Sequence, residues 1–148
     1  MKKILFVMFA LIISFTSILY GSDKKKEENN IKILIKVGEK KLTATLINNA
    51  TSRALITKFP LTILLKDLYN REMCYNFSED LPTDAVKYTD YEVGDIIYWP
   101  PRHSFVIMYA QNGERFAMQK IGRIDSYIEI LKNIGDITVT LEVVKQNL

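Results

Sequence analysis

The amino-acid sequence predicts a mostly β domain, folded as a closed antiparallel β-barrel of about eight strands with two short helices. Three observations indicate this class. Apolar and polar residues alternate over several short runs, turn-forming pairs such as Gly38-Glu39 and Asn112-Gly113 separate these runs, and no repeated strand–helix–strand spacing occurs. Closure into a barrel would also protect the apolar strand edges from pairing with other chains.

The first two strands are predicted at residues 31–37 and 42–46. In the first run Ile31, Ile33, Ile35 and Val37 occupy alternate positions, and in the second run alternate apolar residues are separated by threonines. A period of two places these apolar side chains on one face of each strand. The turn at residues 38–39 is short enough to join the two runs as a hairpin.

A short helix is predicted at residues 50–58. Either Asn48 or Asn49 can cap its start, and Pro60 stops it. The next run, residues 61–69, is strongly apolar and partly β-branched, which predicts a strand that is buried on both faces.

The second half of the chain begins with residues 76–93, which contain turn formers without a sustained period and are predicted to form one long surface loop. Three strands, a helical turn and a closing strand are expected after it. They fall at residues 95–99, 104–110 and 115–121, at residues 126–131, and at residues 137–143.

The N-terminus has the pattern of an export signal. Lys2 and Lys3 supply positive charge, residues 4–20 form an uncharged apolar run, and Gly21 and Ser22 are small residues that suit cleavage. We expect a signal peptide at residues 1–21, a charged tether at 22–30 and one domain at 31–148, in the periplasm or secreted. The alternative is an uncleaved anchor at the short limit for spanning a bilayer, and only then would stable membrane insertion follow.

Charge and cysteine content narrow the classes of partner. The net charge of +3 falls to +1 when Lys2 and Lys3 leave with the signal, because 18 basic residues then face 17 acidic ones. No clustered basic face follows the tether, so nucleic acid is not an expected partner. Cys74 is the single cysteine, which excludes an internal disulfide.

Five motifs in order resemble a small bacterial family of cyclophilin-like domains. They are Leu-Thr-Ala-Thr-Leu at 42–46 with Asn-Asn-Ala-Thr at 48–51, Phe-Pro-Leu-Thr at 59–62, Tyr-Glu-Val-Gly-Asp-Ile-Ile-Tyr-Trp-Pro at 91–100, Phe-Val-Ile-Met-Tyr at 105–109 and Ile-Gly-Arg-Ile at 121–124. The resemblance spans roughly residues 31–144. It implies an eight-stranded barrel capped by two helices, and it does not imply catalysis.

True prolyl isomerases, which this fold resembles, carry an arginine near a Phe-Met-x-Gln-Gly-Gly-Asp stretch, where the guanidinium can hydrogen-bond the prolyl amide. Residues 61–77 of this chain contain no Gln-Gly-Gly-Asp, and Arg71 is their only arginine. This departure from the pattern argues against isomerase activity.

Two segments are candidate ligand-binding sites. The first is residues 98–103, where Tyr98, Trp99, Arg102 and His103 surround two prolines. These residue types suit a binding rim, because large aromatic rings offer contact area and an arginine can bind a carboxylate. The alternative is structural: Trp99 would fill one end of the barrel, and the prolines would only turn the chain.

The second candidate segment contains Tyr69 and Arg71, where an apolar run ends and polar groups should emerge at a barrel mouth. The alternative is that Arg71 pairs with Glu72 in solvent at a turn. No residue is assigned a catalytic role, because His103 lacks a base or acid partner at a suggestive spacing. One histidine and scattered carboxylates make no metal-ligand set, so neither a metal nor a cofactor is expected.

The sequence therefore favours an exported, non-catalytic, cyclophilin-like binding module for a peptide or small-molecule ligand. The alternative is a peptidyl-prolyl cis–trans isomerase that assists folding outside the cytoplasm. That enzyme would need an arginine that points into an apolar proline pocket.

Overall fold

The computed structural model describes residues 29–145 of the chain. In chain order the elements are β1 (Ile31–Val37), β2 (Lys40–Leu46), α1 (Ala50–Ile56), β3 (Leu61–Leu68), β4 (Glu72–Asn76), β5 (Lys87–Thr89), β6 (Asp95–Trp99), the 3-10 helix η1 (Pro100–Arg102), β7 (Ser104–Met108), β8 (Phe116–Ile124), the 3-10 helix η2 (Ile128–Leu131) and β9 (Ile137–Val143). The predicted signal peptide at residues 1–21 and most of the predicted tether at 22–30 lie outside the described residues. Between residues 29 and 145, no helix is long and apolar enough to cross a membrane.

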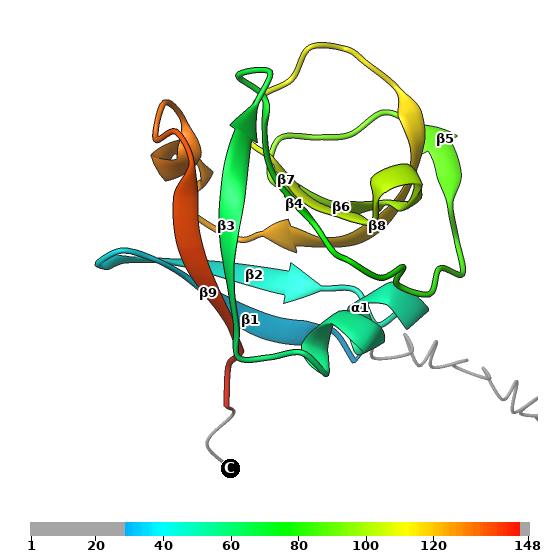
Figure 1. Ribbon diagram of the computed structural model, residues 1–148, viewed down its shortest axis with the longest axis horizontal. Coiled ribbons are helices and arrows are strands. Elements are labelled where there is room, and N and C mark those ends of the chain that lie inside the picture. Colours follow the sequence, from blue (N-terminus) through cyan, green and yellow to red (C-terminus); the bar gives the residue numbers. More distant parts are fainter. Residues whose placement is uncertain (1–28, 146–148) are drawn as a thin grey trace, which may run out of the picture.

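The strands close into an antiparallel barrel (Figure 1). The order around the barrel is β2-β1-β9-β3-β4-β7-β6-β8, and pairing of β2 with β8 closes it, while β5 pairs with the first part of β8. The predicted closed barrel of about eight strands is therefore confirmed. Its helical parts are one α-helix and two 3-10 turns, of which η2 corresponds to the helical turn expected at residues 126–131.

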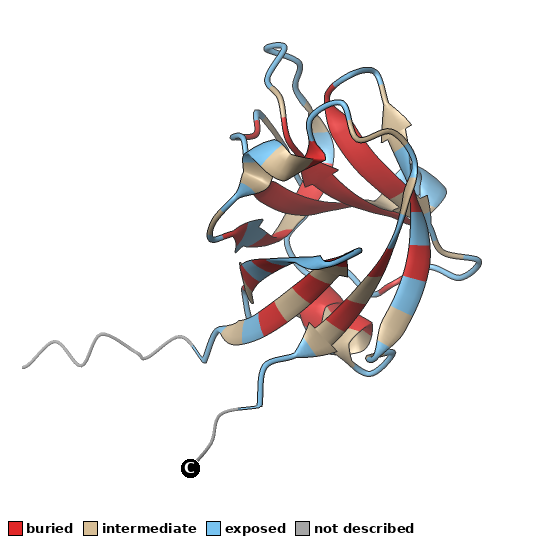
Figure 2. Cartoon of the chain, turned by 90° about the vertical axis from the view of Figure 1, so that its left-hand side faces the viewer, coloured by how far each residue is buried: buried red, intermediate tan, exposed pale blue. Residues whose placement is uncertain are grey.

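Alternate residues of the strands fill the barrel, as the period of two predicts. Ile33, Ile35 and Leu141 are fully buried, and they pack with inward side chains from the other strands into one core cluster. Along several strands buried and exposed residues alternate in bands (Figure 2). Where β2 meets β8 the two backbones approach closely at Gly122, because a Cβ there would lie 2.5 Å from the carbonyl oxygen of Thr45.

Helix α1 begins after Asn49, whose side-chain oxygen accepts a hydrogen bond from the Ser52 N–H at 2.9 Å. The Ser52 hydroxyl donates to the carbonyl oxygen of Ile121 at 3.0 Å, which fixes the helix against β8. The helix ends at Ile56, two residues before the predicted end, with Thr57 as its C-cap.

Two features of the middle of the chain differ from the sequence predictions. Strand β3 is buried on one face only, and Leu64 on its other face is 45% exposed, so the expectation of burial on both faces was wrong. Strand β4 was not predicted, and strand β5 lies within the segment that we expected to be one long loop. Strand β4 lines the candidate site, and Tyr88 of β5 lies beside a residue that lines it.

Candidate functional site

A cleft of about 490 Å³ lies on β4, β7 and β6, on the face of these strands that points away from the barrel core. Its size is within the usual range for small-ligand sites. Fifteen residues line it: Leu68, Tyr69, Arg71, Glu72, Cys74, Asn76, Ile97, Trp99, Arg102, Ser104, Val106, Asn112, Glu114, Arg115 and Phe116.

Strand register builds the floor of the cleft in two transverse rows. Val106 of β7 lies between Cys74 of β4 and Ile97 of β6, which gives an apolar row. Ser104 lies between Asn76 and Trp99 in the same way, which gives a row with polar groups and an aromatic ring. The residues between these positions along each strand point to the opposite face and join the barrel core.

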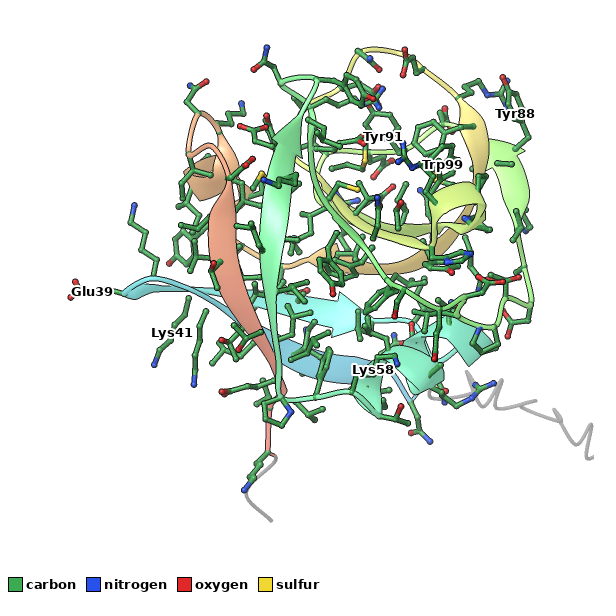
Figure 3. The ribbon with its side chains drawn as sticks, in the orientation of Figure 1. Glu39, Lys41, Lys58, Tyr88, Tyr91 and Trp99 are labelled. Carbon is green, nitrogen blue, oxygen red and sulfur yellow. The ribbon has the colours of Figure 1, made fainter. Side chains whose placement is uncertain are left out.

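A second, smaller hydrophobic cluster forms the base of the cleft. It contains Cys74, Tyr91, Ile97, Val106, Met108 and Met118, with Leu68 and Phe116 packed against it. In Figure 3 the labelled side chains of Tyr91 and Trp99 lie in the upper half of the molecule, and Tyr88 lies at its edge on β5. The three strands β4, β6 and β7 are therefore covered on both faces at this place.

Arg71 forms a paired charge cluster at one end of the cleft. Its Nε and Nη2 donate to Oε2 of Glu72 at 2.9 and 2.6 Å, and its Nη1 donates to Glu114. The rings of Tyr69, Tyr91 and Phe116 surround the guanidinium, with centroids 5.5–5.9 Å from Cζ. Arg71 and Glu72 are each 8% exposed, so this pair is buried in the cleft wall.

The same contacts set the ionisation of these groups. Burial alone would lower the pKa of Arg71, but its hydrogen bonds to Glu114 and Glu72 outweigh burial and raise that pKa. The hydrogen bond from Arg71 lowers the pKa of Glu114 below its ordinary value. Arg71 and Glu114 are therefore both charged at neutral pH.

A different polar group lies at the other end of the floor. The Ser104 hydroxyl donates to Oδ1 of Asn76 at 2.6 Å, and the Cys74 thiol approaches the same oxygen at 3.5 Å. Burial raises the pKa of the Cys74 thiol, while the Ser104 hydroxyl and the Arg102 charge act in the opposite direction. The thiol is therefore a neutral part of the floor rather than a nucleophile.

Four of the six predicted ligand-binding residues line this one cleft. Tyr69 and Arg71 lie in the turn between β3 and β4, and Trp99 and Arg102 lie at the end of β6 and in η1. The fold thus brings together two segments that the sequence treats as separate candidates.

The other two predicted residues lie elsewhere. Tyr98 is fully buried in the barrel core, where its hydroxyl donates to Asp80 and accepts from the Leu81 N–H at 2.9 Å. His103 does not line the cleft; it has a left-handed backbone and caps η1, and its carbonyl oxygen accepts from the Phe77 N–H at 2.9 Å. These contacts explain both residues as parts of the fold.

Several cleft residues were not identified from the sequence. Glu72, Cys74 and Asn76 occupy alternate positions of β4, and a predicted strand there would have shown that they share a face. Glu114 and Arg115 come from the segment before β8, and no local pattern marks them as cleft residues. In the part of the chain that the structure describes, no three His, Cys, Asp or Glu residues are grouped so that they could hold a metal ion.

Comparisons with known proteins agree on the fold. A family model described as the cyclophilin-like family matches residues 35–142. Among solved structures, the chain is similar to the solution structure of the hypothetical protein AF2241 from Archaeoglobus fulgidus, with a TM-score of 0.64 and 17% sequence identity over 81% of this chain and 99% of that one. Comparison with curated proteins gave no match.

Proposed function

We propose, from the premise that this chain belongs to the cyclophilin-like family, that it is an exported binding module that holds a peptide or a small molecule in the cleft on β4, β6 and β7. The family membership confirms the resemblance inferred from the sequence motifs. Export is proposed on the signal pattern at residues 1–21, where positive charge precedes an apolar run and small residues.

The observation that carries the proposal is the composition of the cleft. Apolar side chains cover its centre, while arginine, glutamate, asparagine and serine side chains lie at its ends. Ligand sites combine a mainly apolar wall with a few placed polar groups in this way. Trp99 is partly exposed and lines the cleft, so its indole ring is available for a ligand to stack on.

One observation favours prolyl isomerisation as a second candidate. Arg71 lies in the cleft wall against Phe116, which is an arginine beside an apolar ring. However, three nitrogens of this guanidinium already donate to Glu72 and Glu114. A donor held by two carboxylates has little left to offer a twisted prolyl amide, and an apolar grip alone binds both isomers alike and does not accelerate the reaction.

The isomerase candidate is tested with a proline tetrapeptide. At micromolar protein, we expect the rate of cis–trans isomerisation to stay near background, because the uncatalysed barrier of about 18–20 kcal/mol needs a free donor at the prolyl nitrogen to fall by several kcal/mol. The measurement is a protease-coupled or NMR exchange assay. A clear acceleration that Arg71→Lys or Arg102→Ala abolishes in a folded protein would contradict the binding module and identify the arginine that acts.

The binding proposal is tested by the fluorescence of Trp99, which is the only tryptophan of the chain and lines the cleft. Screening short peptides and small aromatic compounds should reveal ligands that shift or quench its emission. These ligands should also raise the melting temperature, because binding to the native state alone stabilises it. Trp99→Phe should remove the optical signal while calorimetry still detects the ligand. A broad screen without any hit in either measurement would count against a binding role.

A further inference from the structure

Three arginines and two glutamates line the cleft, and their positive and negative charges are distributed unequally within it. Both carboxylates are committed to Arg71, as described above. Arg102 and Arg115 also line the cleft, yet within residues 29–145 neither side chain forms an ion pair or a hydrogen bond. Among the residues that the structure describes, these two positive charges on the cleft therefore lack an ion-pair partner.

Asn76 supplies a hydrogen-bond donor near Arg102. Its Oδ1 accepts from the Ser104 hydroxyl, which orients the amide so that its NH₂ group is left for another acceptor. No hydrogen bond from this NH₂ group to any residue from 29 to 145 occurs, and Asn76 lines the cleft. The hydrogen bond from the Phe77 N–H to the carbonyl oxygen of His103 holds the turn that carries Arg102 beside the end of β4.

The end of the cleft that carries Arg102 and Asn76 is separate from the end that carries the Arg71–Glu72 pair. Asn76 and Glu72 are four residues apart on β4, which corresponds to about 13 Å at 3.3 Å per residue. The intervening floor is the apolar row of Cys74, Val106 and Ile97. An anion near Asn76 would therefore be distant from the Glu72 carboxylate, and the repulsion from that carboxylate would be weak in comparison with the attraction of Arg102.

Arg115, which lines the cleft, lies beside an aromatic ring of strand β5. Its guanidinium lies 5.5 Å from the ring centroid of Tyr88, which is 68% exposed on β5. A contact with a ring face leaves N–H donors of a guanidinium available to an acceptor. Strand β5, which the sequence did not predict, thus places Tyr88 beside a residue of the cleft.

We infer that the cleft selects ligands with a carboxylate next to an apolar or aromatic group, such as a peptide C-terminus or a small aromatic acid. Arg102 and the Asn76 amide bind the carboxylate, Arg115 adds positive potential, and Trp99 with the apolar row receives the neighbouring hydrophobic group. This assignment rests on the proposed binding function and specifies the chemistry of its ligand.

The test compares two acids with their uncharged amides: N-acetyl-phenylalanine and N-acetyl-Ala-Ala-Pro-Phe, each with a free carboxylate or a terminal amide. Binding to the full chain is followed by Trp99 fluorescence and by calorimetry. We expect each acid to bind at least about tenfold more tightly than its amide, because a charge-assisted hydrogen bond is lost. Its affinity should also fall as salt is added. The tetrapeptide and the single amino acid separate a peptide terminus from a small-molecule ligand.

Three variants test whether Arg102 and Asn76 bind the carboxylate. Arg102→Gln should weaken the acids about tenfold and leave the amides unchanged, and Asn76→Asp should weaken the acids further, because it places a like charge at the site. Arg53→Gln is the matched control, since it removes one positive charge on α1 from a residue that does not line the cleft.

Equal affinity for an acid and its amide in the unaltered chain would overturn the carboxylate assignment and leave the binding function standing. An equal loss of affinity for the acids in Arg53→Gln and in Arg102→Gln would also overturn it, because the net charge of the protein, rather than a specific contact with Arg102, would then explain the effect. Absence of binding by all four probes would overturn it as well, and the screen described above would decide the binding function separately.

Discussion

Replacing Tyr98 by alanine is expected to lower the free energy of unfolding by about 3–5 kcal/mol, as other truncations of buried aromatic side chains do. Tyr98 is fully buried in the barrel core. Its hydroxyl also bonds Asp80 and the Leu81 N–H, and burial together with Asp80 raises the pKa of Tyr98 to about 12. Alanine therefore leaves a cavity and releases the loop that carries these partners. Urea denaturation followed by circular dichroism measures the effect.

The adjacent residue provides the control. Trp99 is larger than Tyr98, but it is partly exposed and lines the cleft. Trp99→Ala should cost less than half as much stability and should weaken ligand binding instead. Equal losses of stability in the two variants would mean that Trp99 fills the barrel end, which is the structural alternative for this residue. Tyr98→Phe should lose only about 1 kcal/mol, which isolates the contribution of the hydroxyl.

The barrel could be predicted because most of its strands obey a simple local rule. In β1, β2 and β9 one face is buried and the other is in solvent, so apolar residues recur with a period of two. The same reasoning fails for β4, whose sequence Glu-Met-Cys-Tyr-Asn has no such alternation. One face of β4 packs in the barrel core, and the other contributes Cys74 to the smaller cluster at the base of the cleft. Its pairing with β3 and β7, rather than its composition, makes it a strand.

Strand β5 was missed for a related reason. It has three residues, and its only pairing is with β8, about 30 residues further along the chain. Long-range pairing of this kind leaves no mark on the local sequence. The run at residues 61–69 shows the opposite error, since its apolar character suggested burial on both faces although Leu64 is 45% exposed. An exposed leucine on a protein surface is common, so composition alone does not determine which faces are covered.

The candidate site could be predicted in part because its chemistry is unusual. Aromatic and cationic side chains near chain turns indicated Tyr69, Arg71, Trp99 and Arg102, and all four line the cleft. Tyr98 was grouped with the ligand-binding residues because it is adjacent to Trp99, but adjacent residues of a strand point to opposite faces. The opposite wall, with Glu114 and Arg115, depends on how β8 crosses the sheet, and only the structure shows that.

Replacing Arg71 by methionine is expected to lower the free energy of unfolding by about 3–5 kcal/mol, which is the usual cost of removing one partner of a buried ion pair. Glu72 is 8% exposed, and among the described residues its carboxylate accepts hydrogen bonds only from Nε and Nη2 of Arg71, so the variant leaves a buried negative charge without a partner. Glu114→Gln is the control: the side chain of Glu114 is 62% exposed, so loss of its charge should lower the free energy of unfolding far less than Arg71→Met does. Thermal and urea unfolding measure both variants, and similar small losses in the two would contradict the buried pair.

The double variant Arg71→Met with Glu72→Leu separates stability from function. Removing both charges replaces a buried ion pair by apolar contacts among Tyr69, Tyr91 and Phe116, and such replacements are often neutral or stabilising. We therefore expect the double variant to recover most of the stability that Arg71→Met loses. If it does, the Arg71–Glu72 pair is not required for folding. A double variant as unstable as Arg71→Met would instead make the pair a structural requirement of β4.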